Sequence, residues 1–262
     1  MNYETLILDK KGPVATIIFN RPESYNALNN TLGKEFLEAI LHCGEDSGIR
    51  TVVITGAGKA FCAGGDVKSF KDNLDSISIF LKQLILYFHT ALSEITRMPK
   101  PVIAAVNGVA AGAGMSLAMA CDMTIAVETA RFTMAYTGIA ATPDGSSTYF
   151  LPRLVGLKRA MELVYTNRVL TAKEALEWGI INQVVPEADF KAAVESLAGQ
   201  LAQGPTWALG HTKRLLYLSE HASLETQMEN EAQFIAMAGK TMDFKEGLTA
   251  FVEKRKAQFQ GK

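Results

Sequence analysis

Two turns rich in small residues are the features of this sequence best suited to chemistry. The first is Phe61-Cys-Ala-Gly-Gly-Asp66 and the second is Gly108-Val-Ala-Ala-Gly-Ala-Gly114. Each turn follows a strongly apolar run, and small residues let backbone amides approach a ligand closely. Two such turns on neighbouring strands could aim two N–H groups at one oxygen, which is what an oxyanion hole requires. Local sequence alone leaves tight packing without chemistry as an equal alternative.

Four polar side chains are the further candidates. Asp144 stands in Thr142-Pro-Asp-Gly-Ser-Ser-Thr148, where it could serve acid–base chemistry or cap the following helix. Ser116 and Tyr136 could act in the site or be hydrogen-bonded core hydroxyls. His89 lies inside a predicted helix, a position where a histidine is more often structural than catalytic.

Several familiar sites are excluded by spacing. The segment Gly56-Ala-Gly-Lys59 is not a P-loop, because the spacing of that motif is absent and Ala60 follows the lysine. The glycines of residues 108–114 do not match the dinucleotide-binding fingerprint. No metal is expected, since no metal-binding spacing exists among His42, His89, His211 and His221.

The composition is that of an ordinary globular protein. The chain has 262 residues, of which 48% are hydrophobic and 20% charged, and its net charge is −1. No segment concentrates lysine and arginine, so neither a nucleic acid nor an anionic membrane is an expected partner. The cysteines Cys43, Cys62 and Cys121 are odd in number and far apart, which is typical of reduced thiols in a cytoplasmic protein. No signal peptide and no membrane span is expected from the apolar patterning.

These candidates must be held by elements that hydrophobic patterning predicts. Residues 3–8 and Val14–Phe19 form a predicted hairpin, and buried strands are predicted over 51–55, Val102–Val106 and Met123–Val127. Helices are predicted from a cap at Asn30 or Thr31 to about residue 43, and then over 76–97, 115–120, 190–203, 205–219, 224–238 and 244–256. Alternating strands and helices indicate an α/β architecture with a largely parallel sheet. We expect an α/β core over residues 1–200 and a helical region over 201–262.

The sequence resembles the crotonase (enoyl-CoA hydratase/isomerase) superfamily over nearly its full length. The resemblance is carried by Asn20-Arg-Pro-Glu-Ser-Tyr-Asn-Ala-Leu28, Ala60-Phe-Cys-Ala-Gly-Gly-Asp66, Lys100-Pro-Val-Ile-Ala-Ala-Val-Asn-Gly-Val-Ala-Ala-Gly112, Leu117-Ala-Met-Ala-Cys-Asp122 and Pro152-Arg-Leu-Val-Gly156. It implies a spiral of repeated ββα units with C-terminal helices that assemble a trimer or a dimer of trimers. It also implies an acyl-CoA thioester as substrate, with coenzyme A as part of the substrate and no separate cofactor.

The resemblance also assigns site residues. The amides of Gly65 and Ala113 would form the oxyanion hole for the thioester carbonyl as it becomes an enolate. The residues that would border the CoA moiety, together with these two, are Ala27, Ala63, Asp66, Val67 and Lys68.

The acidic residues are where this chain departs from the hydratases of the superfamily. Those enzymes use two glutamates, at the positions that Ser116 and Tyr136 occupy here. Hydration needs one group to activate water and another to manage the proton at C2, and neither hydroxyl replaces a carboxylate for that work. Asp144 fills a third position, where Δ3,Δ2-enoyl-CoA isomerases carry a glutamate. The 1,2-epoxyphenylacetyl-CoA isomerases are similar over further segments, including Ala111-Gly-Ala-Gly114 and the C-terminal stretch.

The leading hypothesis is therefore acyl-CoA double-bond isomerisation, in fatty acid or aromatic acid metabolism, with Asp144 as a single proton shuttle. A similarity to the 4-chlorobenzoyl-CoA dehalogenase branch supports a second hypothesis, with Asp144 as nucleophile and His89 as base; the tryptophan of that branch is Tyr136 here. An atypical hydratase and a non-catalytic acyl-CoA-binding protein remain as further alternatives.

Overall fold

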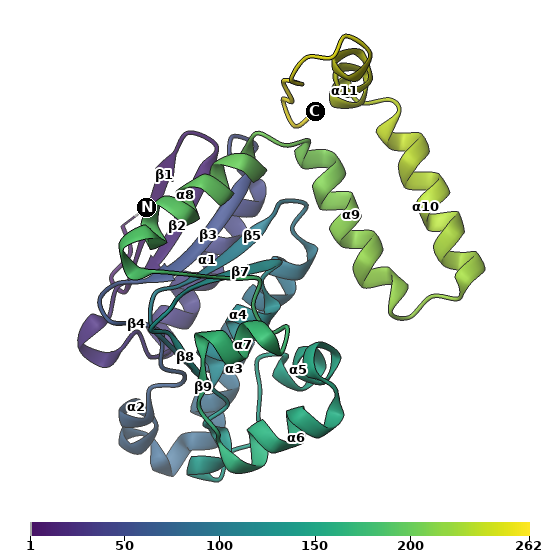
Figure 1. Ribbon diagram of the computed structural model, residues 1–262. Helices are drawn as coiled ribbons and strands as arrows, with labels where there is room; N and C mark the ends of the chain where they lie inside the picture. Colours follow the sequence, from purple (N-terminus) through teal and green to yellow (C-terminus); the bar gives the residue numbers. More distant parts are fainter. Residues whose placement is uncertain (1) are drawn as a thin grey trace.

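A six-stranded sheet forms the centre of the molecule in the computed structural model, which describes residues 2–262 (Figure 1). Its strands lie in the order β1-β2-β3-β5-β7-β10. Their bounds are β1 Leu6–Lys11, β2 Val14–Phe19, β3 Thr51–Gly56, β5 Val102–Val106, β7 Met123–Val127 and β10 Gln183–Val185. β1 pairs with β2 as the predicted antiparallel hairpin, and the other pairings are parallel. The largely parallel sheet is thus confirmed.

A smaller sheet takes the second strand of each repeated unit. Its order is β4-β6-β8-β9, with bounds β4 Ala60–Cys62, β6 Val109–Ala111, β8 Arg131–Thr133 and β9 Leu170–Thr171. Each of the pairs β3/β4, β5/β6 and β7/β8 therefore contributes one strand to each sheet before the chain enters helices, which confirms the ββα spiral. The sequence prediction treated β4 and β6 as parts of turns, which was wrong. A three-residue strand is too short to show periodicity, and for this reason neither strand was predicted.

The helices of the core lie around these sheets. Their bounds are α1 Asn30–Glu45, α2 Val67–Asp72, α3 Ile77–Arg97, α4 Ala113–Ala120, α5 Ser147–Val155, α6 Leu157–Thr166, α7 Ala172–Glu177 and α8 Glu187–Ala202. The cap of α1 is Asn29, whose side chain accepts the Leu32 N–H, and not Asn30 or Thr31 as predicted. Three polar residues in a row each suit the cap position, so the sequence could not choose among them.

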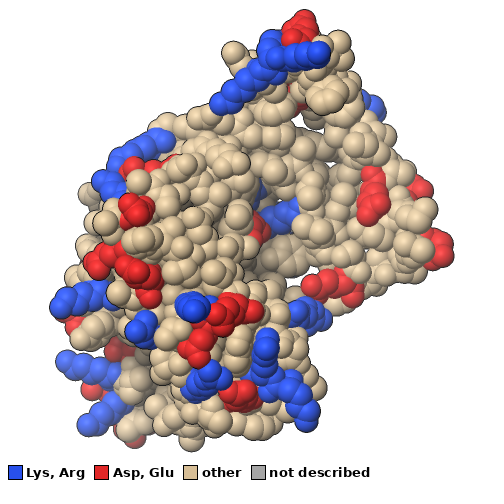
Figure 2. Space-filling view, in the orientation of Figure 1, with Lys and Arg blue, Asp and Glu red and all other residues tan. Residues whose placement is uncertain are grey.

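Three helices extend beyond the core as an arm, which is visible in Figure 1. They are α9 Thr206–Ser219, α10 Leu224–Ala238 and α11 Met242–Val252. Lys213 of α9 is buried and donates to the Ile95 carbonyl and the Asp122 carboxylate, which ties the base of the arm to the core. Figure 2 shows a hollow between the arm and the core. The assembly of trimers through these helices stays a prediction.

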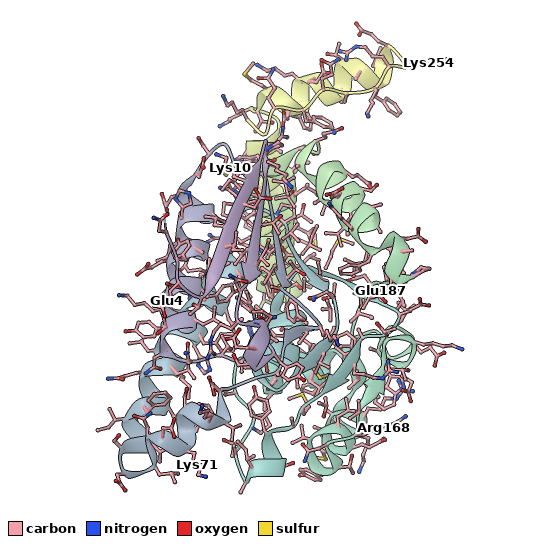
Figure 3. The ribbon with its side chains drawn as sticks, turned by 90° about the vertical axis from the view of Figure 1, so that its left-hand side faces the viewer. Glu4, Lys10, Lys71, Arg168, Glu187 and Lys254 are labelled. Carbon is pink, nitrogen blue, oxygen red and sulfur yellow. The ribbon has the colours of Figure 1, made fainter. Side chains whose placement is uncertain are left out.

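The end of the molecule that carries α2 and β9 lies away from the arm. Lys71 of α2 and Arg168, which precedes β9, lie at the end opposite Lys254 on the arm (Figure 3). Across residues 2–262, none of the helices has the length and apolar character needed to cross a membrane.

Candidate active site

The two small-residue turns adjoin because the strands before them are paired. β4 runs parallel to β6, with Ala60 opposite Val109 and Cys62 opposite Ala110. The first turn of α4 then packs directly on the end of β4. A Cβ atom on Gly114 would lie 2.0 Å from the Cys62 carbonyl oxygen, so only glycine allows this approach. The predicted juxtaposition of the two turns is therefore present.

Each turn has a backbone amide at the expected oxyanion position that has no hydrogen-bond partner inside the described chain. Leu28 donates to the Gly64 carbonyl at 2.7 Å, and Asp66 donates to the Leu28 carbonyl at 2.8 Å. The Gly65 N–H between these two bonds therefore points to the other side of the segment. Ala113 is the first residue of α4, where an N–H has no acceptor within the helix. These two amides are free to donate to a ligand.

An ion pair holds the first turn in place. Arg21 donates to the Asp66 carboxylate at 2.9 Å and also to the Ala27 carbonyl. Asp66 in turn accepts the Ser69 N–H and caps α2. Burial raises the pKa of the Asp66 carboxyl, but the bonds from Arg21 and Ser69 outweigh it and hold the pKa below its ordinary value.

Arg21 was missed as a site residue by sequence reasoning, in which it is only part of the family-like segment from Asn20 to Leu28. The Asp66 side chain was expected beside CoA, but its carboxylate is occupied by Arg21 and Ser69 and only 11% exposed. We therefore assign the Asp66 side chain to holding the turn.

The other residues expected around CoA lie in or next to the first turn and the segment that precedes α1. Ala27 is buried, and Ala63 donates its N–H to the Tyr25 carbonyl at 3.0 Å. Val67 and Lys68 begin α2, and both side chains are exposed. Their contact with CoA stays a prediction.

Ser116, Tyr136 and Asp144 come together in one hydrogen-bonded cluster. The Tyr136 hydroxyl donates to Asp144 Oδ1 at 2.6 Å, and it lies 3.0 Å from the Ser116 hydroxyl. Ser116 Oγ also lies 3.1 Å from the carbonyl of Gly112 and 3.2 Å from that of Asp144. Within the described chain, Asp144 is the only acidic residue whose carboxylate bonds to Tyr136, and its backbone carbonyl lies within hydrogen-bond distance of Ser116. Both residues that replace the hydratase glutamates therefore contact Asp144.

Asp144 is not a helix cap, contrary to one of the two sequence interpretations. The residue that precedes α5 is Ser146, and no side chain caps the helix. Instead the Asp144 carbonyl accepts the N–H and the hydroxyl of Ser147, and its carboxylate turns toward Tyr136. Gly145 makes this possible with a φ of +59°, and a Cβ there would lie 2.7 Å from the Phe88 ring. The glycine after Asp144 therefore directs the carboxylate.

His89 lies behind this loop. Its Nε2 accepts the Gly145 N–H at 3.0 Å, and no bond joins it to the Asp144 carboxylate in the described chain. Its ring borders a separate cavity of about 790 Å³ between α3, α5 and α9, together with Ser146 and Tyr217. The structure thus brings His89 to the backbone of the loop and not to its reacting group.

Comparison with known proteins agrees with this geometry. The family model described as enoyl-CoA hydratase/isomerase matches residues 9–262. The chain belongs to the enoyl-CoA hydratase/isomerase family. The crotonase resemblance is thereby confirmed, and with it a fold and family that process acyl-CoA thioesters.

Relatives within the family carry different activities in their names. The chain is 39% identical over 254 residues to 1,2-epoxyphenylacetyl-CoA isomerase of Escherichia coli, covering 97% of each protein. It is 38% identical over 242 residues to 4-chlorobenzoyl coenzyme A dehalogenase-1 of an Arthrobacter species, covering 92% of this chain and 88% of the relative. The crystal structure of an enoyl-CoA hydratase from Bacillus anthracis superposes with a TM-score of 0.92 at 33% identity, covering 99% of this chain and all of the other. Family membership therefore leaves the reaction to be argued from the site.

Proposed function

We propose that this enzyme is an acyl-CoA double-bond isomerase that uses Asp144 as its single proton shuttle. The observation that carries the proposal is the Ser116–Tyr136–Asp144 cluster. Hydroxyls occupy the two expected glutamate positions, and the Tyr136 hydroxyl bonds to the one carboxylate. The free amides of Gly65 and Ala113 would hold the thioester oxygen. The substrate is an enoyl-CoA or a ring-type arylacetyl-CoA.

The reaction needs no group beyond these. Asp144 takes a proton from C2, and the electron pair of the broken C–H bond moves onto the thioester oxygen to give a dienolate. The two amides stabilise that negative charge, as an oxyanion hole does. The electron pair then returns to form a C–H bond at C4 with the proton held by Asp144, and the double bond moves from Δ3 to Δ2. One carboxylate is ionised at the start and at the end.

Hydration by two glutamates is disfavoured by the same cluster. A hydratase has to activate water with one group while a second manages the C2 proton. Ser116 and Tyr136 are poor bases, and burial together with the nearby Asp144 carboxylate raises the pKa of Tyr136 further. The phenol therefore stays protonated and serves as a donor.

Dehalogenation is the second candidate, because an aspartate stands at the required position and a dehalogenase is among the relatives. That reaction needs His89 as a base for water. Its Nε2 is occupied by the Gly145 N–H, which disfavours the role.

A substrate panel tests the proposal. The purified enzyme is given a Δ3-enoyl-CoA, the CoA thioester of a ring 1,2-epoxide, a Δ2-enoyl-CoA and 4-chlorobenzoyl-CoA. Isomers are separated by liquid chromatography and distinguished by their ultraviolet absorbance, water addition is detected by mass, and released chloride is measured directly. We expect isomerisation of the first or second substrate, little water addition and no chloride release. Chloride release that disappears in His89→Gln would establish the dehalogenase instead. Binding of all four thioesters without turnover of any would indicate a non-catalytic acyl-CoA-binding protein.

A further inference from the structure

The direction of the Ser116–Tyr136–Asp144 hydrogen bonds follows from counting protons. An ionised carboxylate can only accept, so the single proton of Tyr136 is donated to Asp144 Oδ1 at 2.6 Å. Tyr136 then has only lone pairs to offer Ser116, 3.0 Å away, which makes Ser116 the donor in that contact. The result is a chain of donors that runs from Ser116 through Tyr136 to the carboxylate. In such a chain each bond polarises the next.

The two oxygens of Asp144 are made unequal by this chain. Oδ1 accepts the tyrosine hydroxyl, whereas Oδ2 accepts no hydrogen bond from the described chain. A proton taken from substrate would therefore go to Oδ2, because its lone pairs are not engaged. Tyr136 can keep its bond to Oδ1 in both protonation states of the carboxyl group.

Ser116 also lies beside the oxyanion turn, with its Oγ 3.1 Å from the Gly112 carbonyl oxygen. Ser116 has one hydroxyl proton, and in this chain that proton goes to Tyr136. The Gly112 carbonyl is therefore a competing acceptor and not a member of the donor chain. Ser116 is itself fully buried, so its hydroxyl has little freedom to leave these partners.

We propose that Tyr136 and Ser116 are positioning residues that reserve Asp144 Oδ2 as the proton-carrying oxygen. The inference rests on the proposed function, in that it names which atom of Asp144 moves the proton.

The test is the NMR signal of the Asp144 carboxyl carbon in enzyme carrying 13C-labelled aspartate side chains, assigned by its loss in Asp144→Asn. In Tyr136→Phe we expect this signal to move to a new chemical shift, because Oδ1 loses its hydrogen bond. Tyr217→Phe is the matched control, because Tyr217 borders the cavity beside His89 and its hydroxyl makes no hydrogen bond in the described chain. It should leave the signal in place. An unmoved signal in Tyr136→Phe would overturn the inference.

Kinetics on the substrate that the panel identifies give the second readout. Tyr136→Phe should lower kcat about tenfold or more and leave KM within about twofold. A rise in KM at unchanged kcat would contradict a positioning role. The NMR measurement does not depend on turnover, so an enzyme without isomerase activity would refute the proposed function and leave the NMR signal to decide the inference.

Discussion

The two halves of the candidate site are built from different parts of the polypeptide. The oxyanion half uses backbone amides of Gly65 and Ala113, which are positioned by paired strands and a helix start. The base half uses the side chains of Asp144, Tyr136 and Ser116, which are positioned by hydrogen bonds to one another.

This difference explains how relatives of one family can share a substrate handle and differ in reaction. The geometry of a site made of backbone amides changes only when a new Cβ atom displaces the chain or a strand register shifts. The chemistry of a site made of side chains changes with a single substitution. We therefore expect substitutions in the base half to alter chemistry at constant binding, and substitutions in the oxyanion half to alter chemistry through steric displacement.

The largest expected effect comes from Asp144→Asn. Removal of the only base should lower kcat for isomerisation by about 10³-fold or more, within the range of acid–base contributions. Affinity for a saturated acyl-CoA, measured by calorimetry, should stay within about threefold. Normal turnover in this variant would show that the base has been assigned wrongly.

The oxyanion half is disturbed most directly by Gly114→Ala. The new Cβ would meet the Cys62 carbonyl at 2.0 Å, so the start of α4 and the Ala113 amide must shift. We expect kcat to fall by about 10²-fold, as for loss of one oxyanion donor. Gly199→Ala in α8 is the control, since nothing lies within 4 Å of its Cβ position. A helical Gly→Ala change there should keep activity and raise stability slightly.

A smaller effect is expected for Ser116→Ala. Tyr136 keeps its bond to Asp144 but loses the donor behind it, so kcat should fall only about three- to tenfold. Ser147→Ala is the matched control, because Ser147 is buried and donates to the Asp144 carbonyl but not to the carboxylate. If both variants slow the reaction equally, the effect belongs to packing of the loop and not to the hydroxyl chain.

The smallest effect concerns the ion pair that supports the first turn. The pKa of Asp66 is below its ordinary value of 3.8, so its contribution to folding is present above that pH and is lost as the pH falls through the lowered value. Asp66→Asn should lower the free energy of unfolding by about 1 kcal/mol at pH 7 and by less near pH 3. Urea titrations at the two pH values measure this. A difference that grows toward low pH would contradict it.

Much of the scaffold could be predicted from periodicity. The strands β5 and β7 and the helix α10 have the predicted bounds, because their apolar patterns are bounded by clear breaks. The start of α4 was placed two residues late, because its first turn is made of alanine and glycine and shows no periodicity.

The base half was the part that the sequence could not build. The segment that carries Asp144 turns at Ala135, Ala140 and Ser146, all with positive φ. None of these is a residue type that signals the left-handed region strongly, so no local rule predicts the approach of Tyr136 to Asp144. The family resemblance located each position but not the bonds between them.

The central claim is that one carboxylate takes the proton from C2 and returns it to C4. It is tested most directly with a Δ3-enoyl-CoA that carries deuterium at C2, by measuring where the label stands in the Δ2 product. Transfer through Asp144 alone predicts that a measurable share of the deuterium appears at C4 in wild type, and no transfer in Asp144→Asn. Complete loss of the label to water during normal turnover, or transfer that survives in Asp144→Asn, would contradict the single-carboxylate account.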